Sequence, residues 1–115
     1  MQACRLIPKK GLLTTIEAFA VFREKHPAAI LTVAGEGPQL GDLQRRVRQL
    51  NLTRCVYFVG FLGREELRRA YHEAHFFLHP SATDDANDIE GIPNSLLEAM
   101  CTGLPCLSTP HSGIP

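Results

Sequence analysis

The stretch Ala29-Ile30-Leu31-Thr32-Val33-Ala34 decides the fold class. It is short, apolar and rich in β-branched side chains, and it is bounded by Pro27 and Gly35, so it predicts a strand buried on both faces. Residues 11–25 before it carry an apolar stripe with helical spacing. A second amphipathic helix is predicted after it, from apolar residues three and four positions apart: Leu40, Leu43, Val47 and Leu50.

The same alternation of strand and helix continues to the end of the chain. The predicted elements are a first strand within residues 1–6, strands at 55–59, 75–79 and 104–108, and helices at 64–74 and 93–102. Gly103 follows the last helix at the position where glycine ends helices. Strands that are continuous apolar runs between helices predict an α/β fold, a Rossmann-like parallel sheet with helices on both faces. Both ends of the chain look cut, so residues 1–115 are expected to form part of a larger domain.

Composition narrows the function without naming it. Lys and Arg number 12, and so do Asp and Glu, which argues against a nucleic-acid partner. No apolar run approaches the roughly 18 residues of a membrane span, and the first residues carry no signal-peptide pattern. The four cysteines form no CxxC pair, which fits a reducing compartment. We therefore expect a cytoplasmic protein, with Cys101 and Cys106 packed in its interior.

The chemistry is expected where two strands end side by side. In the common strand order 3-2-1-4-5, the first and fourth strands are neighbours, and their exit loops face one crevice. The first exit loop carries Arg5 and Lys10, whose fixed cations suit a diphosphate. The second carries Ser81, an acidic stretch at residues 84–88, and Glu90.

The helix after that second loop adds two further features. With Pro93 at its first position, the amides around Asn94 are free to face an anion, and Gly91 lets a ligand approach the backbone. Glu98 lies about 7–8 Å further along at 1.5 Å per residue. That offset suits a carboxylate that accepts hydrogen bonds from two ribose hydroxyls while the phosphates rest at the start of the helix.

Metal and dinucleotide sites are less well supported. His72, His75 and His79 have no acidic or cysteine ligand at the usual spacing, so structural roles are favoured. The acidic stretch at 84–88 follows a proline in a loop and is better explained as solvated. Gly35-Glu36-Gly37 lacks the third glycine of a dinucleotide-binding turn.

Taken together, several segments that follow one another along nearly the whole chain resemble, in the same order, segments of the family-4 glycosyltransferases. The segments are Arg5–Gly11, Val33–Pro38, His79–Ser81, Glu90–Met100 and Gly103–Pro105. The spacing of Glu90 and Glu98 resembles the E-x7-E signature of that family. The chain is similar to the C-terminal, donor-binding half of an enzyme of the GT-B fold, and the N-terminal acceptor domain of such an enzyme is expected to lie outside residues 1–115. Residues 88–93 and 111–115 look most like bacterial enzymes of colanic-acid and related exopolysaccharide assembly.

The resemblance implies transfer of a hexose, with retention, from a UDP-, GDP- or ADP-sugar to a glycan or lipid-linked acceptor (EC 2.4 class). No metal and no other cofactor would be needed. The isolated piece would bind the donor and be inactive alone. A lipid-linked acceptor would allow the parent protein to associate with the inner face of the membrane. A sugar-nucleotide epimerase of GT-B architecture and a non-catalytic nucleotide-binding module remain alternatives.

The resemblance also assigns roles to individual residues. Arg5 and Lys10 would hold the diphosphate, Glu90 would contact a hydroxyl of the donor sugar, and Glu98 would hold the ribose. The remaining donor contacts would come from backbone beside the sugar, phosphates and base: Gly91, Ile92, Pro93, Asn94, Gly60, Phe61, Leu62, Gly35 and Ser81. Cys4 stands where the family usually has glycine, so the first exit loop is expected to be tighter or displaced.

Overall fold

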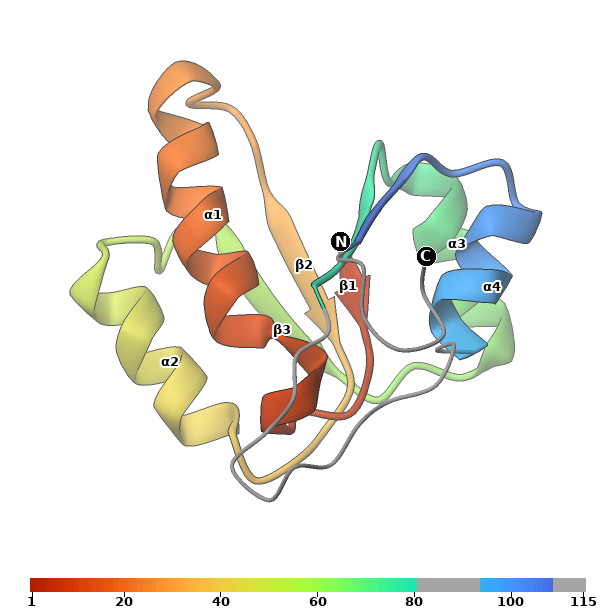
Figure 1. The fold of residues 1–115 in the computed structure, drawn as a ribbon, viewed down its shortest axis with the longest axis horizontal. Helices are drawn as coiled ribbons and strands as arrows, with labels where there is room; N and C mark the ends of the chain where they lie inside the picture. Colours follow the sequence, from red (N-terminus) through yellow and green to blue (C-terminus); the bar gives the residue numbers. More distant parts are fainter. Residues whose placement is uncertain (81–93, 109–115) are drawn as a thin grey trace.

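Strands and helices alternate along the chain as the sequence predicts (Figure 1). The computed structural model describes residues 1–80 and 94–108. The strands are β1 (Gln2–Ala3), β2 (Leu31–Ala34), β3 (Val56–Gly60), β4 (Phe77–His79) and β5 (Cys106–Ser108). The helices are η1 (Pro8–Lys10, a 3-10 turn), α1 (Leu12–Lys25), α2 (Leu40–Gln49), α3 (Arg64–Glu73) and α4 (Asn94–Cys101).

All paired strands run parallel, and β1 lies at the centre. One sheet has the order β1-β2-β3, and β4 pairs with β5. The two groups meet beside β1, because the Leu78 amide donates to the Met1 carbonyl at 2.8 Å and the Met1 nitrogen donates to Phe76 at 2.8 Å. The described strands therefore follow the expected order 3-2-1-4-5.

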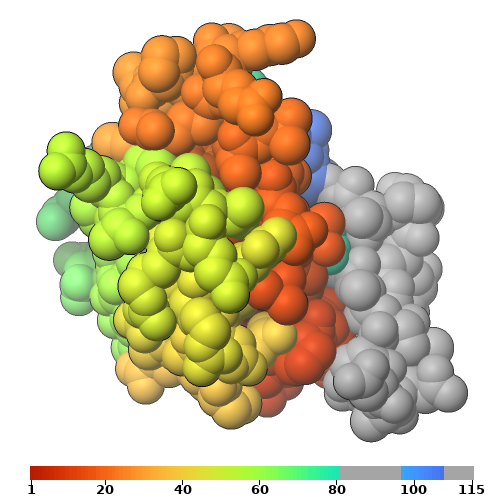
Figure 2. Space-filling model, turned by 90° about the vertical axis from the view of Figure 1, so that its left-hand side faces the viewer, coloured from red at the N-terminus to blue at the C-terminus, as the bar shows by residue number. Residues whose placement is uncertain are grey.

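Helices cover both faces of the sheet, with a separate apolar core on each side. Helices α1 and α2 lie side by side on one face (Figures 1 and 2). The buried members of the core beneath them fall between Leu6 and Val56. Helices α3 and α4 lie on the other face (Figure 1). Their core gathers distant residues: Met1, Ala3, Ala34, Tyr71, Phe77, Ala99 and Leu104. The predicted α/β class and the two-sided helix cover are confirmed.

The strands are shorter than the apolar runs that predict them. Strand β2 begins at Leu31 because β3 offers its first paired residue, Val56, opposite that position. Ile30 lies before the pairing begins and is 61% exposed, and Phe76 is 48% exposed just before β4. The expectation that Cys101 is interior is wrong, since Cys101 is exposed at the end of α4.

Two glycines bring the exit loops into contact. Gly11 has a φ of +71°, and a Cβ atom there would lie 2.7 Å from the Pro80 carbonyl carbon. Gly35 has a φ of +130°, and its Cβ would lie 2.9 Å from the Cys4 carbonyl carbon. The exit loop of β1 therefore packs against the end of β4 on one side and against the exit loop of β2 on the other.

Candidate functional site

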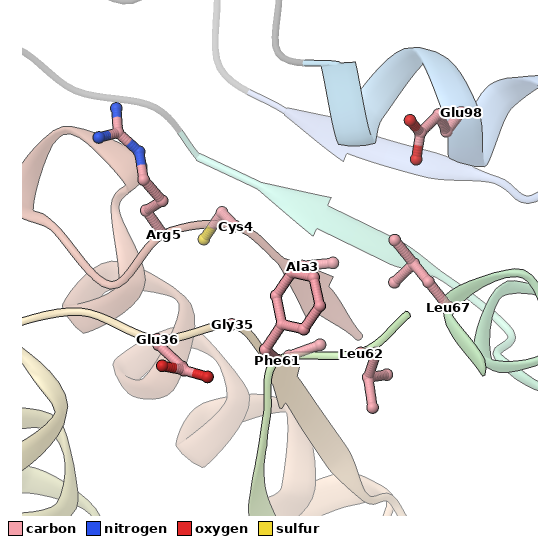
Figure 3. Close-up of a pocket in the computed structure, with 10 residues that line it drawn as sticks. Ala3, Cys4, Arg5, Gly35, Glu36, Phe61, Leu62, Leu67 and Glu98 are labelled. Carbon is pink, nitrogen blue, oxygen red and sulfur yellow. The ribbon is translucent and has the colours of Figure 1, made fainter. Parts of the chain in front are cut away.

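A cavity of about 390 Å³ lies at the carboxyl ends of the parallel strands (Figure 3). Its walls come from the ends of β1, β2 and β3 and from α3 and α4. The residues that line it are Ala3, Cys4, Arg5, Ala34, Gly35, Glu36, Phe61, Leu62, Leu67 and Glu98. Arg5 and Glu98 lie at opposite ends of this group, with Phe61 and Leu62 from the end of β3 below them in the view.

The structure therefore brings several of the expected site residues together. Arg5, Gly35, Phe61, Leu62 and Glu98 share the cavity. Three other expected residues, Lys10, Gly60 and Asn94, do not line it. The Gly60 carbonyl accepts a hydrogen bond from the Gly35 amide at 2.8 Å, and Asn94 is the first residue of α4. The expected contacts at Ser81, Glu90, Gly91, Ile92 and Pro93 lie outside the described residues.

Backbone hydrogen bonds fix the Arg5 segment between two neighbouring loops. The Cys4 amide donates to Ala34 at 3.0 Å, and the Leu6 amide donates to Glu36 at 2.9 Å. Arg5 is exposed between these two anchored residues. The direction in which its side chain leaves the backbone is therefore set by the sheet.

Lys10 ends η1, in the same exit loop, and is held by a buried polar pair. The Thr15 hydroxyl donates to the Gln2 side-chain carbonyl at 2.6 Å, and the Gln2 amide donates to the Lys10 carbonyl at 2.8 Å. Both Gln2 and Thr15 are fully buried. The buried Gln2 in the central strand thus links the loop at Lys10 to Thr15 of α1. The sequence alone does not predict this structural role.

The charge of Lys10 affects two nearby side chains, the partly buried Cys4 and the buried His79. Burial raises the pKa of Cys4 to about 11, against the smaller opposite effects of the Gln2 amide and the Lys10 charge. Cys4 is therefore a neutral thiol at neutral pH. Burial, helped by the Lys10 charge, lowers the pKa of His79 to about 4, so His79 is a neutral imidazole.

Cys4 adopts an ordinary backbone conformation in this loop. Its backbone does not have the positive φ that favours glycine, and the close approach is made by Gly35 opposite its carbonyl group. The thiol lines the cavity beside Arg5. The Cys4 side chain is therefore part of the cavity wall.

Glu98 has a donor partner inside the protein. The Tyr71 hydroxyl donates to Glu98 Oε2 at 3.4 Å. Burial raises the pKa of Tyr71, and the nearby Glu98 carboxylate raises it further. The two residues are 27 positions apart along the chain, so local sequence patterns do not predict their contact.

Two further observations concern metals and membranes. Within residues 1–80 and 94–108, no three His, Cys, Asp or Glu side chains gather closely enough to hold a metal ion. Among the helices that the structure describes, none combines the length and the apolar character needed to cross a bilayer.

The cavity, which is lined by Arg5, Glu36 and Glu98, can be compared with known proteins. The family model described as "Glycosyl transferases group 1" matches residues 2–115. The chain belongs to this family. The resemblance found in the sequence is thereby confirmed.

Its curated relatives include enzymes named for exopolysaccharide assembly. The chain is 41% identical, over 115 residues, to an amylovoran biosynthesis glycosyltransferase of Erwinia amylovora. It is 34% identical over 112 residues to a GDP-mannose-dependent α-(1-6)-phosphatidylinositol monomannoside mannosyltransferase of Mycolicibacterium smegmatis. All of this chain matches the first relative and 96% matches the second, but it spans only 28% and 29% of their lengths.

Solved structures show the same fold in this group of enzymes. An Anabaena protein solved in complex with UDP-glucose superimposes with a TM-score of 0.83 at 25% identity, covering 97% of this chain and 29% of that one. The C-terminal domain of a group 1 glycosyltransferase from Francisella tularensis gives a TM-score of 0.78 at 26% identity, covering 99% of this chain and 57% of that one. The fold of the described residues is therefore that of a glycosyltransferase C-terminal domain of GT-B architecture.

Proposed function

We propose that this chain is the donor-binding part of a retaining glycosyltransferase that transfers a hexose from a nucleotide diphosphate sugar. The observation that carries the proposal is the shared cavity, where Arg5, Gly35, Phe61, Leu62 and Glu98 come together at the strand ends. The Anabaena relative solved with UDP-glucose supports a nucleotide-sugar ligand. The relative named for amylovoran biosynthesis supports a product of the exopolysaccharide class.

Within this proposal, charge in the site matches charge in the reaction. When the sugar leaves the donor, negative charge develops on the nucleotide diphosphate. Arg5 and Lys10 follow the central strand and would stabilise that charge, since cations that are already in place need little rearrangement during the reaction. The amides from Gly91 to Asn94 would support the phosphates and sugar, with Glu90 and Ser81 beside them. The chemistry would then require no metal.

The nucleoside would occupy the other end of the cavity. Glu98 would accept hydrogen bonds from the ribose hydroxyls. The base would lie against Phe61 and Leu62, because the Phe61 ring is 75% exposed at the cavity wall and offers a free aromatic face. A base stacked on an aromatic side chain contributes roughly 1–3 kcal/mol to binding.

The acceptor would be bound by other parts of the parent protein. We propose a glycan or a lipid-linked acceptor, at the cytoplasmic face of the membrane. The chain alone would bind donor and transfer nothing. Product analysis of the parent protein separates glycosyl transfer from epimerisation of the donor.

Calorimetric titration with UDP, GDP and ADP in the presence of EDTA tests the donor site. We expect one of these nucleotides to bind without metal. Glu98→Ala is expected to weaken that binding about tenfold or more, because a hydrogen bond to a charged acceptor contributes about 1.5–3 kcal/mol. Glu24→Ala on α1, distant from the cavity lining, is the matched control and is expected to leave affinity unchanged. A folded protein that binds none of the three, or binds only with Mg²⁺, contradicts the proposal.

A further inference from the structure

Tyr71 joins three elements of the second core. It lies on α3, where its ring is 4% exposed. The ring packs edge-on against Phe77 of β4, with centroids 5.8 Å apart and an interplanar angle of 73°. Its hydroxyl reaches across to Glu98 Oε2 on α4 at 3.4 Å.

Packing alone does not account for the hydroxyl group. A phenylalanine would fill nearly the same volume and would make the same edge-on contact with Phe77. The hydroxyl adds one thing, a hydrogen bond to a carboxylate. That carboxylate belongs to Glu98, which is exposed and lines the cavity proposed for the donor. The buried tyrosine therefore ends at the ligand site.

The side chains of Tyr71 and Glu98 differ strongly in conformational freedom. The Tyr71 ring is fixed by the core, whereas an exposed glutamate samples many rotamers unless a partner restrains it. Within residues 1–80 and 94–108, Tyr71 is the side chain seen to donate to Glu98. A carboxylate has about four acceptor sites, so it can accept from Tyr71 and from a ligand together.

We propose that Tyr71 is a positioning residue: its hydroxyl holds the Glu98 carboxylate in the orientation that receives the ribose hydroxyls of the nucleotide. The inference rests on the proposed function, because it assumes that Glu98 contacts ribose. Tyr71 itself touches no ligand and acts through Glu98. Its raised pKa keeps the hydroxyl protonated, and therefore a donor, across the physiological range.

The test measures the affinity of the variants for two nucleotides. The probes are the nucleoside diphosphate that binds in the calorimetric experiment and its 2′,3′-dideoxy analogue. Tyr71→Phe is expected to weaken binding of the ribose form about 3- to 10-fold, the value of one ordinary hydrogen bond. It is expected to leave the dideoxy analogue unaffected, and to have no further effect in the Glu98→Ala background. Tyr57→Phe is the matched control, since Tyr57 is the other tyrosine and its hydroxyl donates to the Arg54 carbonyl away from the cavity.

The outcomes distinguish failure of the Tyr71 positioning role from failure of the proposed function. Equal loss for both nucleotides, or an equal loss in the Glu98→Ala background, would show that Tyr71 acts by packing and would overturn the inference. Unchanged affinity in Tyr71→Phe would overturn it as well. If Glu98→Ala has no effect, or if no nucleotide binds, the proposed function fails. In that case the contact between Tyr71 and Glu98 is still tested by NMR in the free protein. Tyr71→Phe is expected to shift the ¹³C resonance of the Glu98 carboxylate, whereas Tyr57→Phe is not. An unchanged resonance in Tyr71→Phe would refute the positioning role.

Discussion

Replacement of Gly11 by alanine tests the meeting of the two exit loops. Gly11 has a φ of +71°, a conformation that costs an L-residue roughly 1–2 kcal/mol. The new Cβ would also lie 2.7 Å from the Pro80 carbonyl carbon, inside van der Waals contact with a backbone group that cannot rotate away. Overpacking of this kind adds about 1–3 kcal/mol. We therefore expect Gly11→Ala to lower the free energy of unfolding by about 2–5 kcal/mol.

Two other glycines separate the contributions of strain and contact. Gly103 has a φ of +80° but nothing within 4 Å, so Gly103→Ala should show the strain alone, about 1–2 kcal/mol. Gly41 lies within α2 in open space, so Gly41→Ala should stabilise the protein by about 0.5–1 kcal/mol. Urea denaturation followed by far-ultraviolet circular dichroism gives the three values. If Gly11→Ala costs no more than Gly103→Ala, then Pro80 does not pack on Gly11, and the juxtaposition of the loops after β1 and β4 is wrong.

Two more predictions concern the base and the pH. Phe61→Ala is expected to weaken nucleotide binding by about 1–3 kcal/mol in calorimetry, through loss of base stacking. Phe76→Ala is the control, because Phe76 is also exposed but does not line the cavity. An equal effect of both substitutions would count against stacking. Burial lowers the pKa of His79 to about 4, against 6.5 in the unfolded chain. Between pH 4 and pH 6.5, His79 is therefore protonated in the unfolded state but neutral in the folded state. The free energy of unfolding is highest above pH 6.5 and falls by up to about 3 kcal/mol as the pH drops towards 4. Urea denaturation at successive pH values should show this slope in the native protein and a flatter one in His79→Gln; identical slopes would exclude His79 as its cause.

Local sequence patterns predict the order and type of the elements well. Continuous apolar runs such as residues 29–34 distinguish buried strands from amphipathic helices, and Gly103 adopts the left-handed conformation expected after a helix. The ends of strands are less predictable, because pairing partners set them. Ile30 has the side chain of a strand residue but lies beyond the first paired residue of β3, so it remains exposed.

The location of the candidate site can be predicted from the sequence, because it follows from the order of the strands. The order of the strands brings the Arg5 loop beside Pro80, and the carboxyl ends of the strands locate the cavity. The contacts that hold the site are not predictable in this way. Gln2 and Thr15 are 13 residues apart, and Tyr71 and Glu98 are 27 residues apart. Neither contact can be predicted without the tertiary fold.

The unequal composition of the two cores has a consequence for folding. The buried members of the first core lie between Leu6 and Val56, whereas those of the second extend from Met1 to Leu104. During synthesis, one face of the sheet can therefore close about half a chain before the other. At roughly 5–20 residues per second this interval lasts several seconds, during which the apolar side that awaits α3 and α4 is open to chaperones and to aggregation. The cavity needs loops from the first stage and Glu98 from the second, so it is complete only after α4 has been synthesised.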